Sequence, residues 1–272
     1  MKHVVIAFGG LVSSLFFACG STPVPGPGID PPTIQSQCNV SEQNSYGVCY
    51  PTSDIGTSAH TGTVSGSRIA NFAFTGYVPV NVTPISNPNP PSATQTIHLG
   101  DYYDPQQKGV PGIIGGVPIK LIHLSVAALW CGPCNDETDH VSGSNYTGTN
   151  PAPADSWASQ LAQDGIVFIQ AINEGAVEGV GSTIADLNNW ISPNRHNSDF
   201  TSMVDPEGQN LGIFFDAAAI PFNANIDARS MEILESDVGF DTTLADGLTN
   251  SNSPGTLDTW LKWIAANPPL AQ

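Results

Sequence analysis

Two cysteines separated by two residues are the feature of this sequence with the clearest chemistry. Residues 130 to 134 read Trp-Cys-Gly-Pro-Cys and directly follow a run of small and apolar residues from 124 to 129. We predict that the run is a buried strand, that a tight turn brings Cys131 and Cys134 together and that a helix follows. Backbone N–H groups at a helix N-terminus favour the thiolate form of Cys131, and a thiolate is the form that attacks a disulfide.

Metal binding is the competing interpretation of this cysteine pair. A structural zinc site needs four ligands, usually from two such pairs. The other pair, Cys38 and Cys49, has ten residues between its members, which disfavours zinc. Copper transfer would need ligands beyond two thiols, and the nearest histidines, His123 and His140, are predicted on a strand and on a helix as ordinary packed residues. We therefore expect no metal and no other cofactor.

The five-residue motif resembles the active site of the thioredoxin superfamily. This resemblance implies a thioredoxin-like α/β fold, in which a central mixed β-sheet is flanked by helices. It also implies that Cys131 attacks a substrate disulfide and that Cys134 resolves the mixed disulfide, with Trp130 as a flank of the site. By the same resemblance, Ile220 precedes a cis-proline, Pro221, that contacts the substrate backbone. An ordinary trans proline that opens a strand is the alternative for Pro221.

The segments between these two landmarks fit an alternation of strands and helices. Residues 165 to 172 form an apolar run typical of a buried parallel strand. Thr183 and Asp186 form a capping box, which predicts the start of a helix. Residues 257 to 264 have the helical spacing expected of a last helix that packs on the sheet. Residues 142 to 156 are a loop by composition, and we interpret it as a neutral insertion, with a partner-binding loop as the alternative.

The first 19 residues have the pattern of an export signal. Lys2 precedes a mostly apolar stretch that ends at Cys19 and is too short for a membrane span of about 20 residues. Residues 15 to 19, Leu-Phe-Phe-Ala-Cys, resemble a bacterial lipobox, which implies that Cys19 is lipidated and becomes the new N-terminus. Phe16 and Phe17 depart from the usual pattern, so simple secretion is the alternative.

A tether is predicted after Cys19. Residues 20 to 37 include five prolines and three glycines and little that could enter a core. Such a segment is a semi-extended spacer that reaches at most about 55 Å. Gly20 stands where many lipoproteins of the inner membrane have an aspartate, so the resemblance favours the outer membrane, with the protein facing the periplasm or the cell surface.

Residues 38 to 111 are predicted to form a β-rich N-terminal extension, followed by a thioredoxin-like domain from 112 to 272. In an exported protein, the remaining cysteine pair is typical of a structural disulfide. A Cys38–Cys49 bond would close a loop of about ten residues and stabilise the fold by about 2 to 3 kcal/mol. A second redox pair that relays electrons to Cys131 and Cys134 is the alternative.

Two features resemble the exported TlpA/ResA-like thioredoxin-domain lipoproteins, which act in cytochrome c maturation or related thiol reduction. Residues 69 to 76 resemble their leading strand, and Glu137 stands three residues after Cys134, where this group commonly has a glutamate. On a helix, Glu137 would lie below Cys134 and could tune the thiol pKa or carry its proton. A glutamate that only complements the helix dipole is an equal alternative. Asp139 departs from the group, which usually has a proline there.

Ser125 departs from thioredoxin itself, which has a buried aspartate six residues before the first cysteine. A hydroxyl does not accept a proton near neutral pH, so resolution by Cys134 would depend on Glu137, water or substrate groups. We expect slower turnover than in thioredoxin and a pH profile partly controlled by Glu137. A peroxiredoxin-type peroxidase is disfavoured, because Ala128 stands where that class has a threonine.

The charge of the chain limits its partners. The formal net charge is −17 with only seven Lys and Arg, which disfavours nucleic acid and an anionic membrane surface, so membrane attachment should come from the N-terminal lipid. We predict a lipid-anchored thiol-disulfide oxidoreductase of the cell envelope that acts on protein disulfides or thiols. Its Gly-Pro pair resembles that of reducing thioredoxins, so we expect a reductase with an electron donor in the membrane. A non-enzymatic surface binding module with an inert disulfide is the alternative.

Overall fold

The computed structural model describes residues 43–44, 46–51, 65–77, 93–110, 113–142, 157–191, 200–214, 219–248 and 254–267. The predicted signal peptide, Cys19, the tether, Cys38 and residues 143 to 156 lie outside the described residues. Within the described ranges, no helix is both long enough and apolar enough to cross a membrane. These ranges also contain no group of three or more His, Cys, Asp or Glu side chains that could hold a metal ion.

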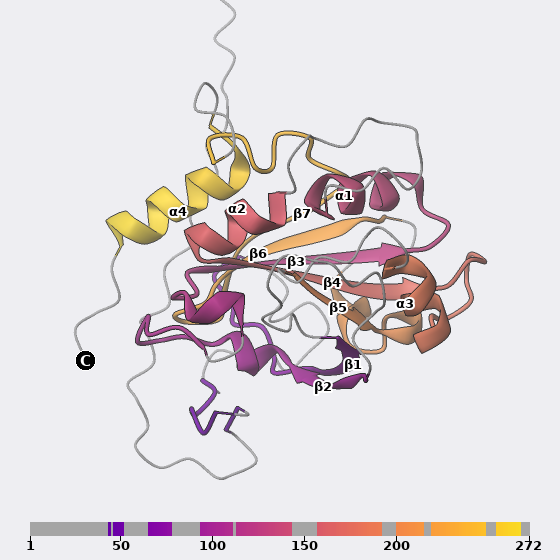
Figure 1. The fold of residues 1–272 in the computed structure, drawn as a ribbon, viewed down its shortest axis with the longest axis horizontal. Helices are drawn as coiled ribbons and strands as arrows, with labels where there is room; N and C mark the ends of the chain where they lie inside the picture. The colour runs from indigo at the N-terminus through magenta and orange to yellow at the C-terminus, as the bar shows by residue number, and fades with distance from the viewer. Residues whose placement is uncertain are drawn as a thin grey trace, which may run out of the picture.

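A mixed sheet of seven strands forms the centre of the protein (Figure 1), in the order β2-β1-β5-β4-β3-β6-β7. The strands are β1 Ala73–Tyr77, β2 Gln95–His98, β3 Leu121–Ala128, β4 Ile166–Glu174, β5 Phe200–Val204, β6 Phe222–Asp227 and β7 Glu232–Val238. β3, β4 and β5 are parallel to one another, and the other neighbouring strands pair antiparallel. Every side chain of β3 and β4 is buried, as the apolar runs predict for strands covered on both faces.

The described ranges form four α-helices: α1 Gly132–Ser142 and α2 Trp157–Asp164 between β3 and β4, α3 Ile184–Ile191 between β4 and β5, and α4 Thr256–Ala266 after β7. In Figure 1, α1, α2 and α4 lie together above the sheet, and α3 lies at the end where β3 stops. α2 and α4 bury Leu161, Leu257 and Trp260 against Leu121 and Phe168 of the sheet. The predicted capping box starts α3, where Thr183 Oγ1 accepts from the Asp186 N–H and the Asp186 carboxylate accepts from the Thr183 N–H.

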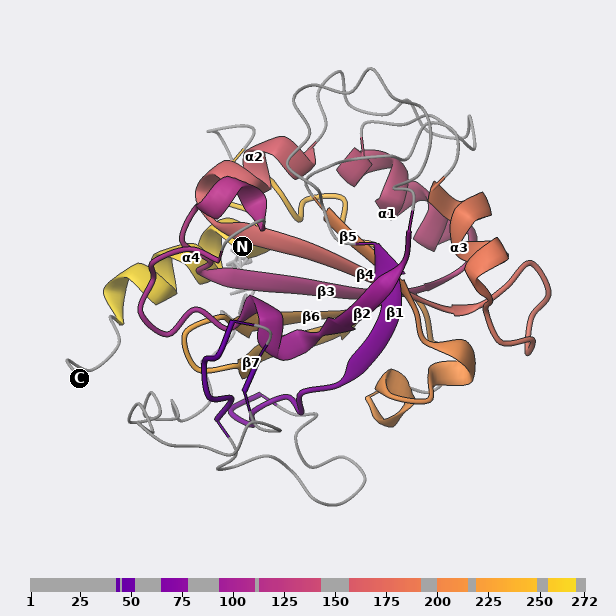
Figure 2. The same ribbon diagram turned by 60° about the horizontal axis from the view of Figure 1, so that its bottom comes forward.

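Residues before β3 cover the opposite face of the sheet (Figure 2). Two short 3₁₀ helices, Leu99–Tyr102 and Ile114–Gly116, contribute Leu99, Tyr102 and Ile114 to a core with Ile122 and Leu124 of β3. β1 and β2 extend the same sheet, because β1 pairs with β5. The residues predicted as an N-terminal extension therefore complete the core that supports β3, and β3 in turn carries the cysteine motif.

Candidate active site

The cysteine motif lies at the junction of β3 and α1. Cys131 and Cys134 form a disulfide, with 5.3 Å between their Cα atoms. The backbone N–H of Cys134 points at Cys131 Sγ from 3.2 Å, so an N–H group of the first turn of α1 would stabilise a thiolate at Cys131 after reduction. Cys131 is 3% exposed and Cys134 is fully buried, so an attacking thiol reaches Cys131 first.

The segment Ile220–Pro221 lies against this disulfide. Its peptide bond is cis, as predicted, and the Ile220 carbonyl oxygen is 3.8 Å from Cys131 Sγ. β6 begins directly afterwards, and Phe222 pairs with Val126 of β3. The antiparallel pairing of β3 and β6 thus brings a proline from ninety residues along the chain to the cysteines.

Trp130 flanks the site and is 38% exposed. Its indole N–H donates to Glu174 Oε2 at 2.6 Å, and the same oxygen accepts from the backbone N–H of Gly179 at 2.9 Å. Glu174 is at the end of β4, where it is paired with Ala128 of β3. Sequence reasoning missed Glu174, because its role depends on the register of β3 against β4 and not on any local pattern.

Glu137 is fully buried on the inner face of α1. The pKa of Glu137 is raised to about 7, mainly by burial, while Ser125 and Asn223 act to lower it and the charge of Asp241 adds a smaller upward shift. Asn223 Nδ2 donates to Glu137 Oε2 at 3.1 Å, whereas Ser125 lies beside the carboxyl group without a hydrogen bond of normal geometry. The first turn of α1 contains no acidic residue, so the role of Glu137 is not to complement the helix dipole.

A row of polar side chains crosses the sheet beneath α1. Ser125 is paired with Gln170 of β4 on one side and with Asn223 of β6 on the other. Gln170 donates to Thr138 Oγ1 at 2.7 Å, and Thr138 donates to the Cys134 carbonyl oxygen at 2.9 Å. The row therefore links the sheet to the backbone of the redox helix. Ser125 could be singled out from the sequence but Gln170, Thr138 and Asn223 could not, because their contact with Ser125 and α1 depends on strand register and helix packing.

The two histidines contact different partners. His123 is buried in β3, bonds Asn225 through Nδ1 at 2.9 Å and stacks on Phe168. His140 lies on α1 between the rings of Trp157 and Phe240. Both positions agree with the prediction that these are packed histidines. Cys49 is disulfide-bonded, but its predicted partner Cys38 lies outside the described residues, so that pairing stays a prediction.

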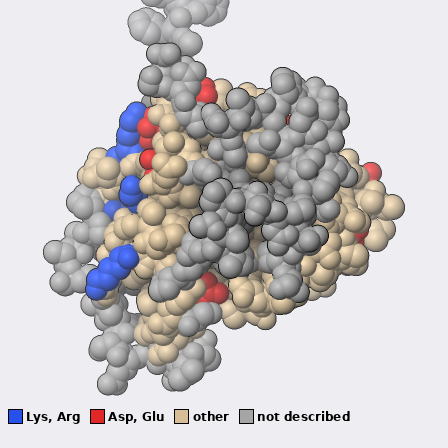
Figure 3. Space-filling view, in the orientation of Figure 1, with Lys and Arg blue, Asp and Glu red and all other residues tan. Residues whose placement is uncertain are grey.

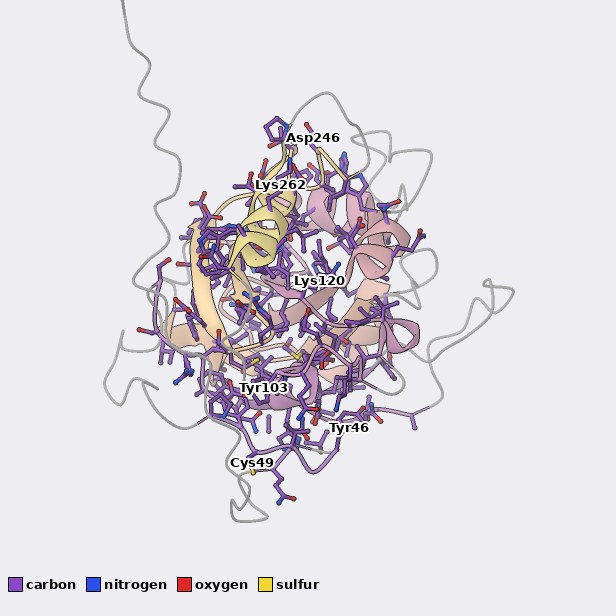
Figure 4. All side chains as sticks on the ribbon, turned by 90° about the vertical axis from the view of Figure 1, so that its left-hand side faces the viewer. Tyr46, Cys49, Tyr103, Lys120, Asp246 and Lys262 are labelled. Atoms are coloured by element: carbon purple, nitrogen blue, oxygen red, sulfur yellow. A yellow bond between two sulfur atoms is a disulfide. The ribbon has the colours of Figure 1, made fainter. Side chains whose placement is uncertain are left out.

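Exposed apolar side chains gather at the end of the sheet that carries Cys131. They follow the carboxyl ends of β3, β4 and β5 or end β7: Trp130, Val177, Val180, Ile213 and Val238. The Lys and Arg side chains visible in Figure 3 lie at the opposite, α4 end of the molecule. Figure 4 looks onto that end and shows Lys120, which precedes β3, and Lys262 of α4. These five exposed apolar side chains and the visible cations thus lie at opposite ends of the described part of the molecule.

The strand order β4-β3-β6-β7, the Cys-Gly-Pro-Cys motif between β3 and α1 and the cis-proline before β6 define a thioredoxin-like α/β fold. No family model and no curated protein sequence match the chain. Several solved structures of thioredoxin-fold oxidoreductases are similar to it. One is described as the thiol:disulfide interchange protein DsbE of Chlorobium tepidum, with 16% identity, a TM-score of 0.39 and coverage of 67% of this chain and 90% of that one.

Two further structures show a likeness of the same order. StoA of Bacillus subtilis has 16% identity and a TM-score of 0.32, over 45% of this chain and 76% of that one. The exposed lipoprotein thioredoxin of Streptococcus pneumoniae has 19% identity and a TM-score of 0.32, over 54% of this chain and 84% of that one.

Proposed function

We propose that the protein is an exported, lipid-anchored thiol-disulfide oxidoreductase that reduces protein disulfides through Cys131 and Cys134. The observation that carries this proposal is the Cys131–Cys134 disulfide at the N-terminus of α1, with Cys131 Sγ against the Ile220 carbonyl oxygen. A helix N-terminus and a neighbouring backbone carbonyl supply the two things that thiol exchange with a polypeptide needs. The helix N-terminus stabilises the Cys131 thiolate, and the Ile220 carbonyl oxygen can accept a hydrogen bond from the backbone of an extended substrate.

The reaction follows from the positions of the two sulfurs. In the reduced protein, the Cys131 thiolate attacks a substrate disulfide, forms a mixed disulfide and releases one substrate thiolate. The Cys134 thiol then loses its proton to the Glu137 carboxylate and attacks Cys131 Sγ. This step releases the second substrate thiolate and forms the Cys131–Cys134 disulfide, so the substrate gains the two electrons that the cysteine pair loses. A dithiol donor in the membrane must then return two electrons.

The surface of the site supports a protein substrate. Trp130 is held by Glu174, whose carboxylate also binds the loop that exposes Val177 and Val180, and the exposed Val238 is paired with Phe222 directly after Pro221. Apolar side chains around a backbone-binding proline provide contact area for an extended segment that carries the disulfide. Ile220 and Pro221 would contact the backbone of that segment.

Export and anchoring rest on the N-terminal sequence. The apolar stretch before Cys19 has the length of a signal peptide, and the tether after it is long enough to hold the catalytic part away from a membrane. Replacement of Cys19 by alanine should move the protein from the membrane fraction to the soluble fraction of its host cells. A protein that remains in the membrane fraction would contradict lipid anchoring.

The redox proposal is tested by trapping and by the reduction potential. Cys134→Ser should accumulate a mixed disulfide between Cys131 and substrate, whereas the control Cys131→Ser should not. Equilibration with dithiothreitol should give a potential of the Cys131 and Cys134 pair below about −250 mV. A value above about −180 mV would indicate an oxidase or isomerase instead. Failure of the pair to exchange would favour the binding-module alternative.

A further inference from the structure

The polar side chains beneath α1 form a buried cluster with unpaired atoms. Five buried side-chain atoms among the described residues have no hydrogen-bond partner, and four of them belong to Ser125, His123, Asn223 and Glu137. The pairing of β3 with β6 sets Ser125 beside Asn223, and His123 lies two residues earlier on the same face of β3. Glu137 closes the cluster from α1 through its bond with Asn223.

The neighbours of His123 determine its tautomer. Glu235 Oε2 accepts from Asn225 Nδ2 at 3.3 Å and from the Trp260 indole at 2.6 Å, which fixes the orientation of the Asn225 amide. Asn225 Oδ1 therefore accepts a hydrogen bond from His123 Nδ1. The hydrogen of the neutral ring is thus on Nδ1, and Nε2 is an unprotonated acceptor. Burial lowers the pKa of His123, which agrees with a neutral ring.

Donors and acceptors in this cluster do not balance when Glu137 is ionised. Asn223 Nδ2 donates to Glu137 Oε2 and to the Gly239 carbonyl oxygen, so Asn223 Oδ1 remains as an acceptor without a donor. His123 Nε2 and Glu137 Oε1 are acceptors too, and the Ser125 hydroxyl is the one donor among the four atoms. Buried acceptors without donors cost free energy. A proton on Glu137 turns one acceptor into a donor and improves the balance.

We propose that His123 is a positioning residue for the redox reaction: its unprotonated Nε2, reached through the Ser125 hydroxyl, stabilises the protonated form of Glu137. Beside the ionised carboxylate, the Ser125 hydroxyl acts as a donor and lowers the pKa of Glu137. Beside the protonated acid, the hydroxyl would turn, accept from the Glu137 carboxyl group and donate to His123 Nε2, so that these unpaired atoms gain partners. This inference rests on the proposed function, because it concerns the proton that Glu137 exchanges with Cys134. When a thiolate attacks Cys131 and the S–S bond breaks, the Cys134 sulfur leaves with the electron pair and takes this proton. The reverse step returns the proton to Glu137.

Other charged and titratable groups also face Glu137 and His123. Asp241, after β7, raises the pKa of both Glu137 and His123. Glu235 of β7 reaches His123 only through Asn225, and β4 presents the uncharged Gln170 and Phe168. On α1, Asp139 is buried, and His140 packs on Trp157 and Phe240. These groups are the same in a variant of His123, so a change in the pKa of Glu137 would come from His123.

The experiment measures the pKa of Glu137 in the oxidised full-length protein from the ¹³C signal of its carboxyl group. His123→Phe keeps a ring that can stack on Phe168 and removes the acceptor. We expect it to lower the pKa of Glu137 by about 0.4 to 1 pH unit, the equivalent of one neutral hydrogen bond. The matched control His140→Phe should leave this pKa unchanged. An unchanged pKa in folded His123→Phe would overturn the proposal.

A second measurement needs no variant of His123. In the wild-type protein, the ¹⁵N signal of His123 Nε2 should follow the titration of Glu137, and Glu137→Gln should abolish this movement. A signal that does not respond between about pH 5 and pH 9 would overturn the proposal even if His123→Phe did not fold. Both titrations are made without turnover. If both effects are seen but the protein does not exchange thiols, the proposed function is refuted, whereas the stabilisation of protonated Glu137 by His123 still stands.

Discussion

Glu137→Gln should make the stability of the oxidised protein less dependent on pH. Glutamine has the shape of the protonated acid, and its amide carries no charge at any pH. Glu137 is fully buried, and burial is the largest cause that raises its pKa from 4.5 to about 7. The folded protein therefore retains a proton over a pH range in which the unfolded chain has released it.

The sign and size of the effect follow from these two values. Below pH 4.5, the carboxyl group is protonated in both states. Between pH 4.5 and about 7, the unfolded chain binds fewer protons than the folded protein, so the free energy of unfolding falls as the pH rises. A pKa difference of about 2.5, at about 1.36 kcal/mol for each pH unit, corresponds to a loss of about 3 kcal/mol by pH 8. Glu137→Gln should not show this loss.

The assay is urea unfolding of the oxidised wild-type protein and of Glu137→Gln at several pH values. Other carboxyl groups affect both proteins equally, so the difference between them isolates Glu137. This difference should shift by about 3 kcal/mol in favour of the variant between about pH 4 and pH 8. Glu178→Gln, in an exposed loop, is the control and should run parallel to the wild type. A constant difference between wild type and Glu137→Gln across this range would refute the reasoning.

Three further substitutions test other contacts. Gln170→Met should lower the free energy of unfolding by about 2 to 3 kcal/mol, because Gln170 accepts from the Trp190 indole at 2.7 Å and donates to Thr138 of α1. A loss below about 0.5 kcal/mol in urea unfolding would contradict this prediction. Glu174→Ala releases Trp130 and should raise KM for a protein substrate about tenfold without changing the rate with dithiothreitol. An equal effect on both substrates would disprove a binding role. Arg229→Met should lower the free energy of unfolding by about 3 to 5 kcal/mol, because Arg229 pairs with the buried Asp227 carboxylate and donates to two carbonyl oxygens at the end of α4. An unchanged free energy of unfolding in urea would show that the pair is dispensable.

Short-range patterns in the sequence predicted the parts of the site that are close along the chain. The Cys-Gly-Pro-Cys motif after an apolar run identified the turn between β3 and α1, and the Thr183 and Asp186 capping box identified the start of α3. The cis bond before Pro221 came from resemblance to a known family, because no local pattern distinguishes it from an ordinary proline.

The tertiary structure decided which distant side chains surround the cysteines. Asn223, Gln170 and Glu174 reach the site through the register of β6 and β4 against β3, over separations of roughly forty to ninety residues. Burial likewise decided the chemistry of Glu137. The three-residue spacing predicted that Glu137 lies below Cys134 on a helix. Only the packing of α1 on the sheet removes the Glu137 carboxyl group from water and raises its pKa. The residue types that can do the chemistry are thus evident from the chain, whereas their protonation and their partners depend on strand register and burial.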